Sequence, residues 1–363
     1  MKVLKSRVVR LFAYICLIAS FIFISGCSAK ESSIISSPVG SVSQGAILDK
    51  RQKTEKNADW LPDKIVPFIA SDWQKAIDEN KNYLYILDGQ NVIVQIDKKT
   101  RESVPVVQCK KEDIISFLIA EEEYLYYQIN ENAIYRYDLL KGNSKQIYYT
   151  EERDSIFGLQ VYKNNTYLYQ SGLIISKFNP KTKEQKILLE NVIDPIFVDN
   201  KLFYMKRRDV STIYSINLET EKKETIRKLK NKKKKRFGNL FQYNGKLCYT
   251  IYGDQGQICM LSDQGRDTTL VKAEPEQIMY PVYSREKDTL YYICQKDIHT
   301  DGDRAYLGIY KEGKNREIQL PKDYKERGCV GNGYFFYEGC DQNEGGEDDY
   351  YCTYINIKNY LKD

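Results

Sequence analysis

The chain has 363 residues, with 55 Lys and Arg against 50 Asp and Glu, which gives a formal net charge of +5. Four of the basic residues fall in the first ten positions, which contain no acid, so the remainder of the chain is close to neutral. A near-neutral chain lacks the strong basic footprint that is usual for nucleic-acid binding. We therefore expect no nucleic-acid partner.

The N-terminus has the order of charges and apolar residues that is typical of an export signal. Basic residues in Met1–Arg10 precede a run of about 14 mostly apolar residues, Leu11 to Ile24. This run is shorter than the ~20 residues that a membrane-spanning helix needs. The pattern predicts a secretory signal peptide.

The end of this segment reads Ile24-Ser25-Gly26-Cys27 and resembles the lipobox of bacterial lipoproteins. The resemblance implies that the Cys27 thiol receives a diacylglyceryl group, that the chain is cut after Gly26, and that acyl chains such as palmitate hold the protein in the membrane. Two acyl chains suffice for a stable anchor. The alternative is an ordinary signal with a chance cysteine. We expect a lipid-anchored protein at the extracytoplasmic face of the cell membrane.

The sequence divides into three parts. Residues 1–26 form the signal peptide, and residues 27–58 contain the lipidated Cys27 and a tether rich in Ser, Lys and Gly. Residues 59–363 form the folded domain, which is long enough for a substantial core. Within it, Cys248 with Cys259 and Cys340 with Cys352 lie on neighbouring predicted strands, as disulfides or as buried free thiols.

A short strand motif recurs through the folded domain. Taking Leu84, Leu125, Leu168, Leu202, Leu247, Leu290 and Phe335 as markers, successive copies are 41, 43, 34, 45, 43 and 45 residues apart. Seven copies at this spacing match the blades of a β-propeller. Each copy has a partner strand downstream, such as Ala133–Asp138, that ends at an Asp or Asn before a turn. We predict an all-β fold with seven four-stranded blades; a two-sheet sandwich and an eight-blade propeller are the alternatives.

The last copy runs out of chain after the strand Cys352–Ile357, and the strand-like stretch Lys64–Ala70 has no blade of its own. We predict that Lys64–Ala70 completes the last blade and so closes the ring and covers its open edge. Pro67 suits an outermost strand, which has one unpaired side.

The repeats resemble the Tyr-rich propeller repeats of bacterial surface lipoproteins and, distantly, the YWTD repeats of lipoprotein receptors. This resemblance implies the fold and supplies no catalytic residues. The 31 tyrosines could form a sugar-stacking surface, but their spacing is that of the repeat, which favours packing between blades.

Three polar segments are candidates for binding. The single histidine, His299, lies in the acidic stretch Asp297–Asp303, and a second acidic stretch spans Asp341–Asp349. Both lack full calcium-loop spacing and are either acidic turns or one cation-binding patch. The run Lys228–Arg236 either binds anionic polymer or lipid headgroups or is a solvated loop. We predict no metal site, no cofactor and no catalytic residue.

Three functions are compatible with this sequence. The first is a non-catalytic binding or scaffolding propeller for a protein or an envelope polymer, because a ring of loops forms a binding platform without fixed catalytic groups. The second is a propeller lyase or hydrolase that uses carboxylates and a metal ion. The third is an accessory subunit of an envelope complex.

Overall fold

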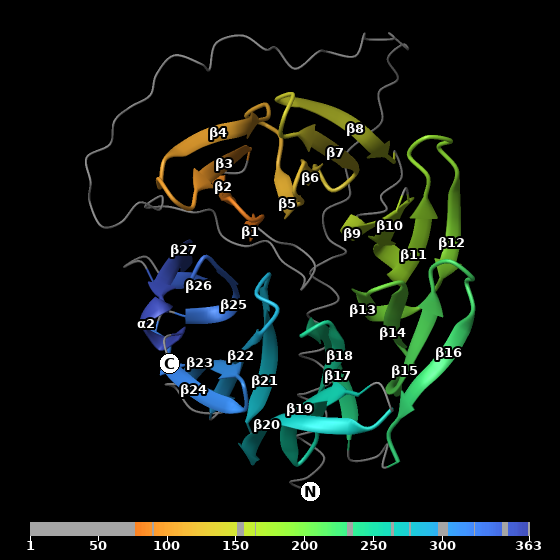
Figure 1. Ribbon diagram of the computed structural model, residues 1–363, viewed down its shortest axis with the longest axis vertical. Helices are drawn as coiled ribbons and strands as arrows, with labels where there is room; N and C mark the ends of the chain where they lie inside the picture. The colour runs from red at the N-terminus through yellow and green to blue at the C-terminus, as the bar shows by residue number, and fades with distance from the viewer. Residues whose placement is uncertain are drawn as a thin grey trace, which may run out of the picture. The chain divides into compact units, whose positions relative to one another are not determined.

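The computed structural model in Figure 1 describes residues 77–361, with gaps at 89–90, 151–155, 164, 231–234, 263–264, 276, 297–303, 323 and 343–347. The signal peptide, Cys27, the tether and Lys64–Ala70 therefore lie outside the described residues. No helix in the described part is long and apolar enough to cross a membrane.

The described strands follow one another in seven consecutive groups, each antiparallel within itself, and groups 6 and 7 are joined into one seven-stranded sheet by parallel pairing of their first strands. Group 1 contains β1 (Ile77–Glu79), β2 (Tyr83–Asp88), β3 (Val92–Asp97) and β4 (Ser103–Gln108). Group 2 contains β5 (Ile115–Ala120), β6 (Tyr124–Ile129), β7 (Ala133–Asp138) and β8 (Asn143–Tyr149). Group 3 contains β9 (Ile156–Tyr162), β10 (Asn165–Gln170), the turn η1 (Ser171–Leu173), β11 (Ile174–Phe178) and β12 (Gln185–Leu189).

Groups 4 to 7 repeat this order. Group 4 contains β13 (Val192–Val198), β14 (Lys201–Lys206), β15 (Asp209–Asn217) and β16 (Lys223–Lys228). Group 5 contains β17 (Arg236–Tyr243), β18 (Lys246–Tyr252), β19 (Gln255–Leu261) and β20 (Asp267–Pro275). Group 6 contains β21 (Ile278–Ser284), β22 (Thr289–Lys296), β23 (Arg304–Lys311) and β24 (Lys314–Gln319). Group 7 contains β25 (Tyr324–Gly331), β26 (Tyr334–Gln342) and β27 (Asp348–Asn356), followed by α2 (Lys358–Leu361).

Figure 1 shows these groups following one another around a ring, with the first strand of each group toward its middle. Apolar clusters join each group to the next one along the chain. A further cluster contains Leu84 of group 1, Leu125 of group 2 and Phe336 of group 7, and it therefore joins the last described group to the first. The prediction of an all-β propeller is confirmed, while the number of blades in the whole chain stays a prediction.

The tyrosines of the repeat motif lie in this core. Tyr85, Tyr167, Tyr249 and Tyr291 are among the largest fully buried side chains of the described residues. They lie on the second strands of groups 1, 3, 5 and 6, where alternation points successive side chains to opposite faces of the sheet. Their role is packing between blades, as the spacing predicts.

The strand that leads into each repeat belongs to the group that follows it. Pro195–Val198, for example, lies in β13, which pairs with β14 of group 4. Each group therefore begins with an inner strand. The inner strand of group 1 is Ile77–Glu79, which pairs with β2.

Four of the turns between the third and fourth strands have the same hydrogen-bonding pattern. The side-chain oxygens of Asp97, Asp138, Asn179 and Asn217 each accept two backbone N–H groups from the residues two and three positions further on. Asp and Asn favour such turns because their short side chains replace a backbone acceptor. The sequence predicts these turn residues correctly.

Cys248 and Cys259 are buried free thiols, so the disulfide between them is not formed. Cys248 lies opposite Met260, and Cys259 lies opposite Tyr249, so the two cysteines are one position away from facing each other across the strand pair. An offset of one residue points two side chains to opposite faces of a sheet. Accordingly, Cys248 packs between groups 5 and 6, and Cys259 packs between groups 4 and 5. Burial raises the pKa of the Cys248 thiol to about 12. The side chains of Cys340 and Cys352 lie outside the described part.

Candidate functional site

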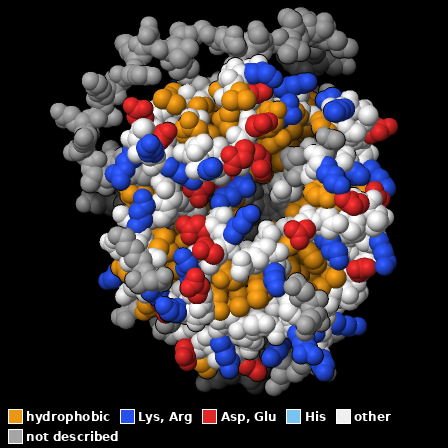
Figure 2. All heavy atoms as spheres, in the orientation of Figure 1, with side chains coloured by type: hydrophobic (Ala, Val, Ile, Leu, Met, Phe, Trp, Pro, Cys, Tyr) orange, Lys and Arg blue, Asp and Glu red, His pale blue; other side chains and the backbone are white. Residues whose placement is uncertain are grey.

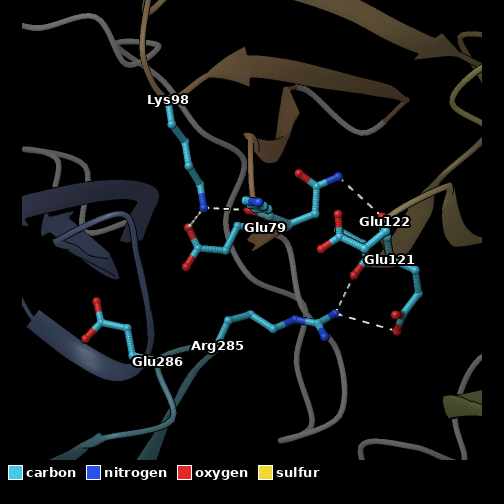
Figure 3. A pocket seen from close by; sticks show the side chains of 9 residues that line it. Glu79, Lys98, Glu121, Glu122, Arg285 and Glu286 are labelled. Carbon is cyan, nitrogen blue, oxygen red and sulfur yellow. Dashed lines mark hydrogen bonds and ion pairs between the residues drawn. The ribbon is translucent and has the colours of Figure 1, made fainter.

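A charged hollow of about 300 Å³ lies at one end of the inner strands. Antiparallel neighbours place the turns after β1, β5, β21 and β25 at the same end of their sheets, which we call the hollow end. The turns between the second and third strands lie at the opposite end. Figure 3 shows the side chains that line the hollow, which are Glu79, Asn80, Lys81, Lys98, Ala120, Glu121, Glu122, Arg285 and Glu286. In the space-filling view, acidic and basic side chains lie close together near the middle of the ring (Figure 2).

The floor of the hollow is a buried ion pair between groups 1 and 6. The Asp78 side chain is fully enclosed, and it accepts hydrogen bonds from Arg285 Nε at 3.0 Å and Arg285 Nη2 at 2.8 Å. The Tyr283 hydroxyl donates to the same carboxylate at 3.0 Å, and the Ala120 N–H donates at 2.9 Å. A buried carboxylate is costly unless its lone pairs are satisfied, and four donors meet that need here.

Arg285 also connects the floor with group 2. Its Nη2 donates to the Ala120 carbonyl at 2.5 Å and lies 3.9 Å from the Glu121 carboxylate. Burial acts to lower the pKa of the Arg285 guanidinium, but hydrogen bonding and attraction to Asp78 outweigh it and raise the pKa. The guanidinium therefore stays charged and holds groups 1, 2 and 6 together.

A second ion pair forms one wall of the hollow. Lys98 Nζ lies 2.8 Å from the Glu79 carboxylate and donates to the Asn80 carbonyl at 2.6 Å. The Asn332 N–H of group 7 donates to Glu79 at 3.1 Å. Burial raises the pKa of Glu79 above its ordinary value, against the lowering effect of Lys98. Glu79 thus links the first and last groups of the ring.

Three carboxylates form the remaining rim. Glu121 is 44% exposed and only loosely paired with Arg285, and Glu286 accepts a hydrogen bond from the Tyr291 hydroxyl at 2.6 Å. The pKa of Tyr291 is raised by its burial and then by this hydrogen bond, so Tyr291 remains a donor. Figure 3 shows Glu121 and Glu122 on one side and Glu286 on the other side of Arg285. The opposite charges cancel within the pair Asp78–Arg285 and within the pair Glu79–Lys98. The three carboxylates of the rim therefore leave it acidic.

The residues of the hollow do not match a metal centre. Among the described residues, no three His, Cys, Asp or Glu side chains are grouped so that they could hold a metal ion. The two most buried acids, Asp78 and Glu79, are already engaged by Arg285 and Lys98. What the arrangement can provide is charged hydrogen-bonding groups of both signs around one opening.

None of the segments predicted from the sequence is among the described residues that line the hollow. Cys27, His299 and the rest of Asp297–Asp303 are outside the described residues, as are residues 343–347 of the second acidic stretch. The described strands that flank these stretches, β22 with β23 and β26 with β27, meet at the end opposite the hollow. The ends of the Lys228–Arg236 run are described, between β16 and β17 at that same opposite end.

The sequence analysis did not identify the residues of the hollow. The sequence does place polar or charged residues directly after three inner strands, at Asn80–Lys81, Glu121–Glu122 and Arg285–Glu286. Such positions also suit ordinary exposed turns, so the pattern alone could not distinguish a site from a solvated loop.

Comparisons with known proteins agree on the fold. No family model and no curated protein matches the chain. The solved structure of an oligogalacturonate lyase from Vibrio parahaemolyticus matches with a TM-score of 0.59 at 11% identity, covering 83% of this chain and 93% of the lyase. An oligogalacturonate lyase in complex with manganese matches with a TM-score of 0.55 at 11% identity, covering 82% of this chain and 91% of that lyase. YCF48 from Cyanidioschyzon merolae matches with a TM-score of 0.50 at 9% identity, covering 76% of this chain and 93% of YCF48. At these identities the likeness shows the propeller fold alone, and its solved neighbours include an enzyme.

Proposed function

We propose that this protein is a lipid-anchored binding propeller of the cell envelope, which is not itself catalytic and receives its ligand at the hollow. The lipobox at Cys27 supports the anchor, and the repeat-built ring supports a platform of loops. The observation that carries the proposal is the hollow itself, an opening framed by turns from groups 1, 2 and 6 with an acidic rim.

The charges of the hollow favour a ligand segment that carries cationic groups. The two buried pairs are internally neutral, so a ligand meets chiefly Glu121, Glu122 and Glu286 together with the exposed Lys81. A basic peptide segment of an envelope protein, or an amino-bearing polymer, has complementary charge. Charge complementarity of this kind gives specificity and a faster association rate rather than high affinity.

The test is a capture experiment on an envelope extract with the mature chain, residues 27–363. A variant with Glu122→Gln and Glu286→Gln removes two charges from the rim. A control variant with Glu112→Gln and Glu131→Gln removes the same charge from exposed turns at the opposite end. We expect the wild type and the control to retain the same ligand, and the rim variant to retain much less of it.

The outcomes separate the proposals. Equal capture by the rim variant would place the ligand outside the hollow. Constant co-purification of one membrane protein complex would favour an accessory subunit of an envelope complex. Turnover of a substrate without any retained partner would contradict the non-catalytic function.

A second candidate is a lyase acting on acidic oligosaccharides, which the similarity to oligogalacturonate lyases favours. The described residues do not supply a manganese site, so such an activity would need groups beyond them, among which His299 is the only histidine of the chain. The test is the formation of unsaturated product from oligogalacturonate, with and without manganese. Activity that a His299→Ala variant loses would establish this function.

A further inference from the structure

A basic patch lies at the end of the ring opposite the hollow, on groups 4 and 5. Lys206 is the last residue of β14, and Arg207 and Arg208 form the turn to β15; all three are exposed. Four further exposed residues lie at the end of β16 and the start of β17: Lys228, Lys230, Lys235 and Arg236. We call these seven residues the basic patch. Lys232, Lys233 and Lys234 lie outside the described residues.

Strand pairing brings the parts of the patch together. Lys228 lies opposite Thr212 in the β15–β16 pair, and the Leu229 N–H donates to the Ser211 carbonyl at 2.9 Å. On the other side of the same sheet, Lys206 lies opposite Val192 in the β13–β14 pair. Strand β17, which begins with Arg236, contacts both β13 and β15. The patch is therefore a surface of folded sheet ends rather than a single charged loop.

The positive charge of the patch is not cancelled by ion pairs. Within the part of the chain that the structure describes, none of the seven side chains forms an ion pair. The described acids at this end of groups 4 and 5 are Glu190, Asp194, Asp209, Asp254 and Glu274. Asp209 is occupied by the hydroxyls of Ser211, at 2.7 Å, and Tyr214, at 2.9 Å. The seven bases outnumber these acids.

We propose that the basic patch docks on anionic lipid headgroups of the membrane in which Cys27 is anchored. This inference rests on the proposed lipid anchor. A lipidated chain keeps the ring close to the bilayer, which makes docking an intramolecular event at high effective concentration. Each Lys or Arg near an anionic membrane surface contributes about 1 kcal/mol, and one acyl anchor combined with a basic patch binds far more stably than either signal alone.

Docking through this patch orients the ring. The patch and the hollow lie at opposite ends of the ring, so contact at the patch turns the hollow away from the bilayer. The ligand at the hollow is then presented to the space outside the membrane.

The experiment uses the mature chain, residues 27–363, with Cys27→Ser so that no lipid is attached. Its partition onto sedimented vesicles of phosphatidylglycerol and phosphatidylcholine is compared with that onto phosphatidylcholine alone, at low and high salt. The patch variant carries Arg207→Gln, Arg208→Gln, Lys228→Gln, Lys230→Gln and Arg236→Gln. The control variant removes five exposed charges at the hollow end: Lys99→Gln, Lys141→Gln, Lys181→Gln, Lys287→Gln and Lys314→Gln.

We expect the wild type and the control to bind the anionic vesicles and to be released by salt. Because 1 kcal/mol corresponds to about a fivefold change, loss of five patch charges lowers the partition at least about tenfold. Equal thermal unfolding of the two variants shows that both are folded. The basic residues of the tether are present in all forms, so they cannot cause a difference in binding between them.

Three results would overturn the proposal: equal binding by the patch variant, equal binding to neutral vesicles, or retention by isolated anionic wall polymer without retention by vesicles. The last result would assign the patch to the polymer. Because the assay uses unlipidated protein, it is independent of whether Cys27 carries lipid, which metabolic labelling with a fatty acid tests separately.

Discussion

Asp78 and Arg285 are 207 residues apart in the sequence and form a two-point ion pair at the middle of the ring. Asp78 belongs to the inner strand of group 1, and Arg285 follows the inner strand of group 6. The pair therefore reaches past group 7, whose strand β25 runs parallel to β21 at Tyr283 and Ser284. It connects the beginning of the folded chain with its C-terminal third.

Removal of Arg285 should destabilise the ring strongly. In Arg285→Ala, the fully enclosed Asp78 carboxylate loses its counter-charge, and breaking a buried pair in this way costs about 3 kcal/mol. This is the low end of the usual cost of breaking a buried ion pair, and we choose it because the Arg285 side chain is 35% exposed. Arg266→Ala, at an exposed turn, should change the free energy of unfolding by less than about 0.5 kcal/mol. Urea denaturation measures both, and equal midpoints would contradict the assignment.

Glu79 should make stability fall as the pH rises. Burial raises its folded-state pKa above the ordinary value of 4.5, so the native state binds a proton more tightly than the unfolded chain. The contribution of Glu79 is fully present below pH 4.5 and is lost as the pH rises through the raised folded value. Glu79→Gln does not titrate, so it should gain stability relative to the wild type over that interval. A difference in unfolding free energy that is constant with pH would refute this.

The repeat was predictable because its determinants are local. Tyr-Leu-Tyr alternation, partner strands and Asp or Asn turn residues all act within about 40 residues, and they predicted β2, β6, β10 and their partners. The inner strand Ile77–Glu79 was not predicted, because three residues with two acids show no alternation that would identify a strand.

The hollow was not predictable from these local patterns. Its floor depends on which turns meet at the middle of the ring, and Asp78, Ala120 and Arg285 are brought together only by closure. From the sequence alone, Arg285 is one charged residue in an exposed turn. For Cys248 and Cys259 the sequence left a disulfide and buried free thiols open, because strand register could not be determined to one residue, and the structure shows the free thiols.

Gly308 should not tolerate a side chain. It lies opposite Tyr292 in the β22–β23 pair, and a Cβ atom there would lie 2.1 Å from the Tyr292 ring. Because Tyr292 is fully buried and its hydroxyl donates to Asn315 at 2.8 Å, the ring cannot move without losing that bond. Overpacking of this kind costs about 1–3 kcal/mol, which thermal or urea unfolding of Gly308→Ala would show. In the double variant Gly308→Ala with Tyr292→Leu, the two effects should not add, since the smaller residue removes the clash. Strict additivity would contradict the clash.

The closure of group 7 by Lys64–Ala70 stays a prediction, and the strand order now gives it a geometric basis. Group 7 has three described strands, and β27 is its outer edge. From the outer strand of one group to the inner strand of the next, the connections contain between two and seven residues. If Lys64–Ala70 pairs with β27, residues 71–76 form the connection to β1, and their number is six, as between β4 and β5.

Deletion of residues 64–70 should therefore expose the edge of β27. Without a fourth strand, the outward N–H groups of Asp348–Asn356 would be open to water, so their hydrogen exchange should become faster. Mass spectrometry of the peptide covering β27 measures this, with the peptide covering β10 as an internal reference for global unfolding. Deletion of the equally long segment 36–42 from the tether should leave both peptides unchanged. Unchanged exchange at β27 after loss of residues 64–70 would mean that the ring closes through its inner contacts alone, those of Asp78 with Arg285 and of Glu79 with Asn332.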